Sequence, residues 1–219
     1  MAGISQPWTK GRAPWNATGR GWRDRHEWTA APVDRSSPRP AVAGDICVLL
    51  APSRPLSGPG AAFVDRLQAD LGGERVEPLH VTVDRVATHD AAALIQSVGD
   101  SVRRLRQAPI NVGRLYFLPS QSRGPEIVKL EVGPDPLLDD DTNELLAALR
   151  RCGLPSLYPT DRAKPTITVL QRVIRRDSLV PDVSALPLEL FVADRVIVSR
   201  ITGMARYEIL DAASIAASG

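Results

Sequence analysis

The sequence predicts an α+β fold, with an α/β arrangement as the alternative, because segments that suit β-strands are interleaved with amphipathic helical segments. Two of the strand-like segments share one pattern of polar and apolar residues. Residues 1–44 show neither the two-residue period of a strand nor the 3.6-residue period of a helix over any sustained length. The chain has 219 residues, of which 43% are hydrophobic and 24% charged, as in ordinary globular proteins. We therefore expect an irregular arm at 1–44 and a folded domain at 45–219.

The first half of the domain alternates strand and helix. Residues 46–50 are a short apolar run that suits a buried strand. Residues 61–71 carry apolar side chains at helical spacing and are followed by two glycines, which commonly end a helix. The next strand is expected within 76–86, and a second amphipathic helix is expected over 90–106.

The second half contains more strands and one further helix. Three aspartates open the helix predicted over 139–152, where carboxylates suit the positive end of the helix dipole. Segments rich in β-branched residues are expected to complete the sheets. The strands are predicted within 110–118, 126–132, 165–173, 186–201 and 206–210.

Composition excludes several classes of protein. No stretch approaches the roughly 18 uninterrupted apolar residues of a membrane-spanning helix, and the first residues do not resemble a secretory signal. Cys47 and Cys152 lack the spacing of a metal site and are expected to be reduced thiols. We therefore expect a cytoplasmic protein with no membrane partner, no metal and no cofactor.

The arm at 1–44 differs from the rest of the chain in charge. It holds seven Lys and Arg against three Asp and Glu, a net +4, whereas residues 45–219 hold 20 against 22, a net −2. It also contains all four tryptophans, at positions 8, 15, 22 and 28. Tryptophan and arginine together can bind single-stranded nucleic acid, or aromatic anchors can dock on a protein partner. The alternative is that the arm packs on its own domain or stays disordered.

The repeated pattern lies in residues 80–86 and 166–173. Successive side chains of a strand point to opposite faces, so His80 and Thr82 are expected on one face of the first segment. By the same alternation, one face of the second segment carries Lys164, Thr166, Thr168 and Arg172. If the two strands lie side by side, these polar faces merge into one cleft.

Such a face suits the chemistry of phosphodiesters. An imidazole can accept or donate a proton near neutral pH, and a threonine hydroxyl can bind a phosphate oxygen. Lys164 and Arg172 would add charge-assisted contacts to the anion. The alternative for His80 is a hydrogen-bonded histidine of the sheet with no role in chemistry.

With these residues, the chain resembles the two-histidine phosphoesterase superfamily, which includes bacterial RNA 2′,3′-cyclic phosphodiesterases formerly called 2′-5′ RNA ligases. The resemblance rests on His80 and Thr82, on Thr166 and Thr168 placed 86 residues later, and on the strand at 127–132. It implies a bilobal fold of two related lobes at 45–219, with two antiparallel-rich sheets lining a central cleft and helices outside. It also implies catalysis without metal, in which one histidine deprotonates the nucleophile and another protonates the leaving oxygen.

The second motif departs from that pattern because Thr166 stands where the resemblance expects a histidine. Threonine does not titrate near neutral pH, so half of the acid–base pair is missing. His26 or His89 reaching the cleft would restore it, as would Lys164 acting as a cation or acid. The more common roles of both histidines are structural ones.

Three functions remain open. The first is a phosphodiesterase acting on a cyclic phosphate or a 2′-5′-linked nucleotide or RNA, with His80, Thr82, Thr166 and Thr168 in the site. The second is a nucleotide- or RNA-binding protein that keeps the cleft without turnover, since losing an imidazole affects chemistry more than anion binding. The third is an interaction protein working through its arm. Three aromatic residues are candidates to stack on a base, with core or loop packing as the alternative: Tyr116, Phe117 and Tyr158.

Overall fold

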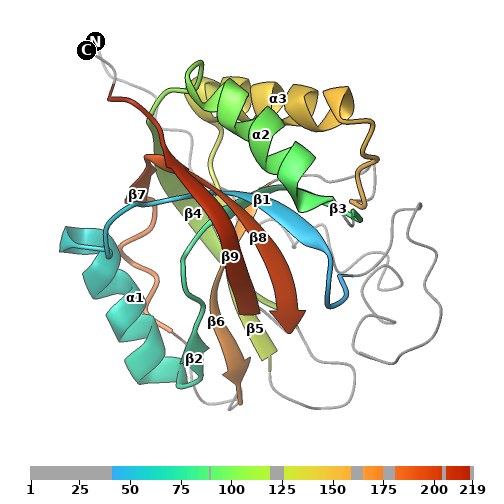
Figure 1. Ribbon diagram of the computed structural model, residues 1–219. Helices are drawn as coiled ribbons and strands as arrows, with labels where there is room; N and C mark the ends of the chain where they lie inside the picture. Colours follow the sequence, from blue (N-terminus) through green and yellow to red (C-terminus); the bar gives the residue numbers. More distant parts are fainter. Residues whose placement is uncertain are drawn as a thin grey trace, which may run out of the picture.

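The computed structural model describes residues 41–88, 90–118, 126–158, 165–174, 181–203 and 206–217. Within these ranges the chain forms three helices and nine strands, arranged as an α+β fold with two antiparallel sheets (Figure 1). The predicted fold class is therefore confirmed. None of the helices in the described ranges is long and apolar enough to cross a membrane.

The elements follow the expected order, except that the two-residue strand Glu74–Arg75 was not expected and the segment predicted at 186–201 forms two strands. In sequence they are β1 (Ile46–Ala51), α1 (Gly58–Leu71), β2 (Glu74–Arg75), β3 (Val81–Val86), α2 (Ala91–Val102), β4 (Ala108–Leu118), β5 (Glu126–Val132), α3 (Pro136–Arg151), β6 (Thr166–Val173), β7 (Leu188–Ala193), β8 (Arg195–Gly203) and β9 (Arg206–Ser214).

The two sheets mix strands from distant parts of the chain. The first sheet has the order β3-β1-β8-β9, so the opening strand pairs with a strand near the C-terminus. The second sheet has the order β2-β6-β5-β4-β7. The strand pairs of both sheets are antiparallel. β3 is therefore an edge strand of the first sheet, and β6 lies inside the second.

The helices cover the sheets from different sides (Figure 1). α1 packs on β6 and β7 of the second sheet, whereas α2 and α3 pack on each other and against β9 and β3 of the first. Gly60 lets α1 approach β7 closely, because a Cβ at this position would lie 2.3 Å from the backbone oxygen of Leu190. The apolar faces of both sheets and of the three helices meet in one continuous core.

Several predicted boundaries need correction. The strand expected from residue 76 begins only at Val81, so His80 stands immediately before it. α2 ends at Val102 rather than at 106. α3 begins at Pro136 instead of 139, because the side chain of Asp135 caps it by accepting hydrogen bonds from two backbone N–H groups of the first turn. The short strand β2 has no counterpart in the sequence prediction.

Candidate active site

The alternation expected for the two motif strands holds at residues 81–83 and 166–169 and then breaks, since Val169 and Leu170 are both core residues. Val81 and Val83 of β3 lie in the main core, so Thr82 between them points to the other face of the first sheet. On β6, residues 167 and 169 lie in the core in the same way, which places Thr166 and Thr168 on the other face of the second sheet. The two motifs therefore both present polar side chains away from the core.

The motif strands do not pair with each other. β3 and β6 belong to different sheets, yet the two strands approach one another where the sheets meet. The two strands are therefore not paired side by side as expected. Instead β3, at the edge of the first sheet, lies near β6, inside the second. Residues from the two sheets contribute to one candidate site.

His80 is held in a defined chemical state. Its side chain is buried, with only 3% of the residue exposed. The Nδ1 atom lies 2.7 Å from the backbone oxygen of Pro78. Because a carbonyl oxygen can only accept, Nδ1 must carry the proton, which leaves Nε2 with its lone pair when the ring is neutral. The ring of Tyr207 packs edge-on at 4.8 Å between ring centroids.

Burial also sets the charge of His80. It lowers the pKa of the imidazole to about 4, against the opposing effect of the hydrogen bond to Pro78, and the positive charge of Lys129 lowers it further. The ring is therefore neutral at physiological pH. Lys129, on β5 of the second sheet, is thus one of the charges that act on His80.

The face of the second sheet that turns away from the core carries two rows of polar residues, which we call the polar rows. They follow from strand register, since residues opposite one another share a face. The first row is Tyr116, Lys129 and Thr168, and the second row is Arg114, Glu131 and Thr166.

Contacts connect the two polar rows. The Nζ atom of Lys129 lies 3.5 Å from Oγ1 of Thr166. The hydroxyl of Tyr116 donates a hydrogen bond to Glu131, whose Oε2 also lies 4.0 Å from Nη1 of Arg114. Burial raises the pKa of Tyr116, and the bond to Glu131 raises it further. Tyr116 is therefore a hydrogen-bond donor in the site.

Sequence reasoning missed three members of these rows: Lys129, Glu131 and Arg114. The alternation of polar and apolar residues in the strand at 126–132 carried the available signal, because Val128 and Leu130 are core residues and the positions between them must face away. What the sequence did not give was the neighbour of each residue on the adjacent strands.

Other predicted site residues lie elsewhere. Phe117 points to the opposite face of β4 and packs against the core. Arg172 lies at the outer edge of the second sheet, where its Nη1 atom is 3.0 Å from Oε1 of Glu74. It stands near the C-terminal end of β6, whereas Thr166 begins that strand, and its own backbone is not extended, with a φ of 55°. Lys164, His26 and His89 lie outside the described residues.

Tyr158 lies beside a buried ion pair of the first sheet. Its ring centroid is 5.2 Å from the guanidinium carbon of Arg85. The Nε atom of that arginine lies 3.5 Å from Oδ2 of Asp45, and both side chains are almost fully buried. A guanidinium over an aromatic ring is a favourable contact, so the geometry gives Tyr158 a packing role with Arg85.

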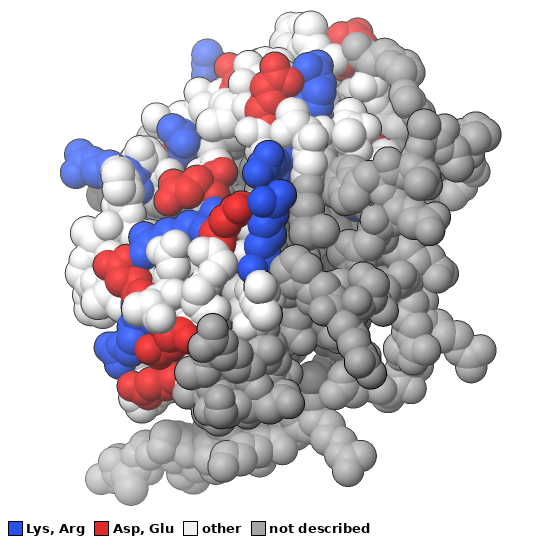
Figure 2. Space-filling view, turned by 90° about the horizontal axis from the view of Figure 1, so that it is seen from below, with Lys and Arg blue, Asp and Glu red and all other residues white. Residues whose placement is uncertain are grey.

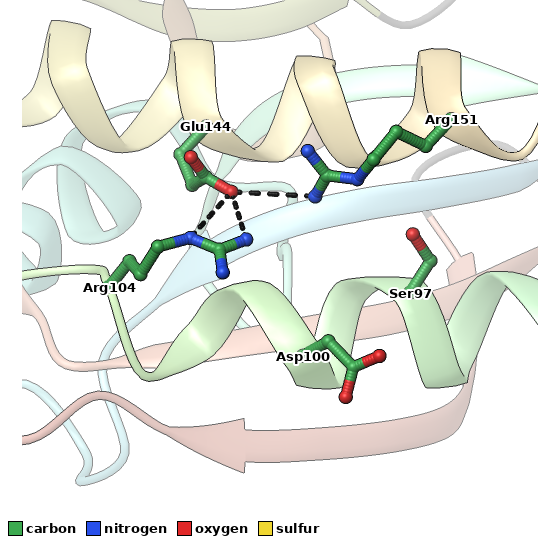
Figure 3. A pocket seen from close by; sticks show the side chains of 5 residues that line it. All are labelled: Ser97, Asp100, Arg104, Glu144 and Arg151. Carbon is green, nitrogen blue, oxygen red and sulfur yellow. Dashed lines mark hydrogen bonds and ion pairs between the residues drawn. The ribbon is translucent and has the colours of Figure 1, made fainter.

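A polar hollow of about 410 Å³ lies between α2 and α3, away from His80. Figure 3 shows Glu144 between Arg104 and Arg151, with Ser97 and Asp100 on the neighbouring helix. Oε1 of Glu144 lies 2.5 Å from Arg104 Nη2 and 3.4 Å from Arg151 Nη2. The bond from Arg104 lowers the pKa of Glu144. These charges neutralise one another, so the hollow offers no ligand an uncompensated charge.

No patch of one sign dominates the described part of the face in Figure 2, where acidic and basic side chains are interspersed. The described ranges also contain no group of three or more His, Cys, Asp or Glu placed to hold a metal ion.

Comparison with known proteins gives a likeness in structure. No protein-family model matches the sequence, and no curated protein matches it. A crystal structure of a phosphoesterase aligns with a TM-score of 0.53 at 16% identity, covering 79% of this chain and 98% of its own. Protein TT0787 of Thermus thermophilus aligns with a TM-score of 0.54 at 15% identity, covering 80% and 100%.

Escherichia coli LigT, in a complex with 3′-AMP, aligns with a TM-score of 0.50 at 15% identity, covering 79% of this chain and 98% of its own. The alignments include nearly the whole of each of these proteins. The described domain therefore has a phosphoesterase-like fold.

Proposed function

We propose that the chain is a metal-independent phosphodiesterase acting on a cyclic phosphate or a 2′-5′-linked nucleotide or RNA. The observation that carries this proposal is the state of His80, a neutral imidazole whose Nδ1 proton is held by Pro78. In this state Nε2 is the ring atom that can accept a proton. The phosphoesterase-like fold supports the resemblance inferred from the motif residues.

In this proposal His80 is the general base that takes a proton from the attacking water. Thr82 and the two threonines of β6 hold the phosphate oxygens through their hydroxyls. The lowered pKa makes His80 a weak base in the free protein. A bound phosphate anion would raise that pKa, because a neighbouring negative charge favours the imidazolium.

The ligand class has support from one structural neighbour. One crystal structure of LigT is a complex with 3′-AMP, a nucleoside monophosphate. The polar rows offer this chain the hydroxyl groups of Thr166 and Thr168 for such a phosphate. We propose a nucleotide or the end of an RNA as the ligand. The hydroxyl of Tyr116 already donates its one proton to Glu131, so it has none for the phosphate, and stacking on a base stays the role predicted for its ring.

A second candidate is nucleotide binding without turnover. The position expected to hold the second histidine is Thr166, which cannot titrate near neutral pH. His80 itself is only 3% exposed. Loss of an acid lowers the rate far more than it lowers ground-state binding of the anion.

One experiment on the full chain distinguishes the phosphodiesterase from the nucleotide-binding protein without turnover. Purified protein is incubated with 2′,3′-cyclic nucleotides and with short 2′-5′ and 3′-5′ oligonucleotides, and products are followed by chromatography. We expect turnover that falls about 10²–10⁴-fold in His80→Asn. Arg66→Gln is the control, because it removes only an exposed ion pair with Asp182.

The outcome that contradicts a phosphodiesterase is an intact wild-type protein that binds 3′-AMP and converts none of these substrates. His80→Asn would then bind comparably, and the second candidate would stand. Circular dichroism of each variant checks that it is folded.

A further inference from the structure

We propose that Lys129 takes the place of the missing second histidine, as the acid that protonates the leaving oxygen of the substrate. This inference rests on the proposed function. It assigns the second half of the acid–base pair to a residue outside both motifs.

Position is the first argument. Lys129 lies on β5, between β4 and β6, and its neighbours across the strands are Tyr116 and Thr168. Its Nζ atom lies 3.5 Å from the hydroxyl of Thr166. The ammonium therefore stands beside the position where the resemblance expects an imidazole.

The backbone gives a second, independent argument. The register between β5 and β6 shifts on both sides of Val128, immediately before Lys129. Such irregularities change the direction of the next side chain and are frequent beside active sites. The strand thus departs from regular pairing at the residue that the proposal needs.

Electrostatics supply a third argument. Burial is the largest cause of the lowered pKa of His80, and the positive charge of Lys129 from the second sheet lowers it further. The carboxylate of Glu131, two residues further along β5, receives Arg114 and the hydroxyl of Tyr116. The negative charge of Glu131 is therefore shared between Arg114 and Tyr116.

The proposed step balances its protons and electrons. On a 2′,3′-cyclic phosphate, water attacks phosphorus while Nε2 of His80 takes the water proton. The bond from phosphorus to one ribose oxygen breaks, and that oxygen keeps the electron pair and receives a proton from the ammonium of Lys129. The product is a phosphomonoester with a free hydroxyl. Imidazolium and amine then return to their starting states by exchanging one proton through solvent.

The test varies the leaving group. Ribose alkoxide needs a proton as it leaves, whereas p-nitrophenolate leaves as a stable anion. We compare wild type, Lys129→Gln and Lys129→Arg on a 2′,3′-cyclic nucleotide and on the p-nitrophenyl ester of a nucleoside 5′-phosphate. Lys129→Arg keeps the charge, but a guanidinium scarcely gives up its proton. Arg66→Gln is again the control.

On the cyclic nucleotide we expect kcat to fall about 10²–10⁴-fold in both Lys129 variants, the usual contribution of a general acid. On the nitrophenyl ester we expect Lys129→Arg to keep kcat within about threefold of wild type, since no acid is needed there. The alkaline limb of the wild-type pH profile on the cyclic nucleotide should be absent in Lys129→Arg.

Four results would overturn the inference. Wild-type activity of Lys129→Arg on the cyclic nucleotide would mean that charge alone matters. Equal losses on both substrates would mean that Lys129 supports the fold or binds phosphate in general. Full activity of both variants would remove Lys129 from the reaction while leaving the phosphodiesterase proposal intact. Absence of wild-type turnover on both substrates would instead refute the proposed function together with the acid role.

Discussion

At the scale of single residues, one hydrogen bond determines what His80 can do. The carbonyl of Pro78 fixes the proton on Nδ1, and burial keeps the ring neutral. A histidine placed in this way can act as a base, because its remaining ring nitrogen is an acceptor. The same burial has a consequence for stability.

We expect the free energy of unfolding to decrease between about pH 6.5 and pH 4 because of His80. The folded pKa lies at about 4, below the ordinary 6.5, so the unfolded chain takes up a proton in this window before the folded chain does. The stabilisation is complete above pH 6.5 and is lost as the pH falls toward 4. The shift corresponds to about 3 kcal/mol at most.

Denaturant unfolding at several pH values measures this loss. The difference in unfolding free energy between wild type and His80→Asn should shrink as the pH falls from 7 to 4. Asparagine keeps a donor for Pro78 but does not titrate in this range. A difference that stays constant across these pH values would show that the imidazole is not held neutral by the fold.

The residues of the site were only partly predictable. His80, Thr82, Thr166 and Thr168 follow from alternation along single strands, and the structure places the three threonines away from the core. Lys129 did not follow, because one lysine on a strand ordinarily marks a solvent-facing position. Its position beside Thr166 depends on the pairing of strands 37 residues apart, which local pattern does not determine.

At the scale of elements, α3 begins earlier than predicted, and this changes the surroundings expected for Asp141. The sequence places three aspartates at the helix start, where the dipole stabilises carboxylates. The helix begins earlier, so Asp135 takes the capping role and Asp141 falls in the second turn. Asp141 is 3% exposed and accepts hydrogen bonds from the backbone N–H of Arg106. An acid expected at a helix end is in fact buried beside the loop that follows α2.

We expect Asp141→Asn to stabilise the protein at pH 7. Burial raises the pKa of this carboxyl to about 6, so the charged form is disfavoured in the folded state. The folded chain therefore holds its proton between about pH 4 and 6 while the unfolded chain has lost it, and stability falls as the pH rises through this window. Asparagine keeps an acceptor for Arg106 and removes the charge, a gain of roughly 1–3 kcal/mol at pH 7.

Unfolding of wild type, Asp141→Asn and the control Asp70→Asn is measured at pH 7 and pH 4. Asp70 is an exposed carboxylate on α1. The advantage of Asp141→Asn should largely disappear at pH 4, where the wild-type carboxyl is protonated. Destabilisation at pH 7 would show that the charge on Asp141 is needed by Arg106.

Most elements were predictable because their signals are local. Apolar spacing and glycines identified α1, and β-branched runs identified the strands. The strand start at Val81 and the two-residue strand β2 were not found, because neither is marked by a change in hydrophobic pattern. Both are defined by pairing with strands elsewhere in the chain.

At the scale of the whole molecule, the proposed site takes residues from both sheets. The first sheet joins the opening strand to the last two, and the second sheet is built mostly from the middle of the chain. The base of the proposed reaction comes from the edge of the first sheet, and the phosphate-binding hydroxyls and the ammonium come largely from the second. Local patterns predicted the fold class, while this division depended on strand order.

Charge is also distributed unevenly over the molecule. Residues 45–219 carry a net charge of −2, and the described face in Figure 2 mixes acidic with basic side chains. Residues 1–44 carry a net +4 with all four tryptophans. We therefore propose that affinity for single-stranded RNA, where the protein has it, comes from residues 1–44.

We expect the binding of single-stranded RNA by the full chain to weaken with salt, because phosphate contacts release counterions. The variant Arg20→Gln, Arg23→Gln, Arg25→Gln should bind more weakly, and its slope of log affinity against log salt should be shallower by about 2, at about 0.7 for each phosphate-binding arginine removed. The matched control replaces Arg66, Arg104 and Arg200 with Gln, which removes three arginines from exposed ion pairs. Fluorescence anisotropy over a range of salt concentrations measures both slopes.

Equal slopes for the two triple variants would locate the phosphate contacts outside the arm. A wild-type affinity that does not change with salt would instead favour apolar docking of the tryptophans, because an apolar interface releases no counterions.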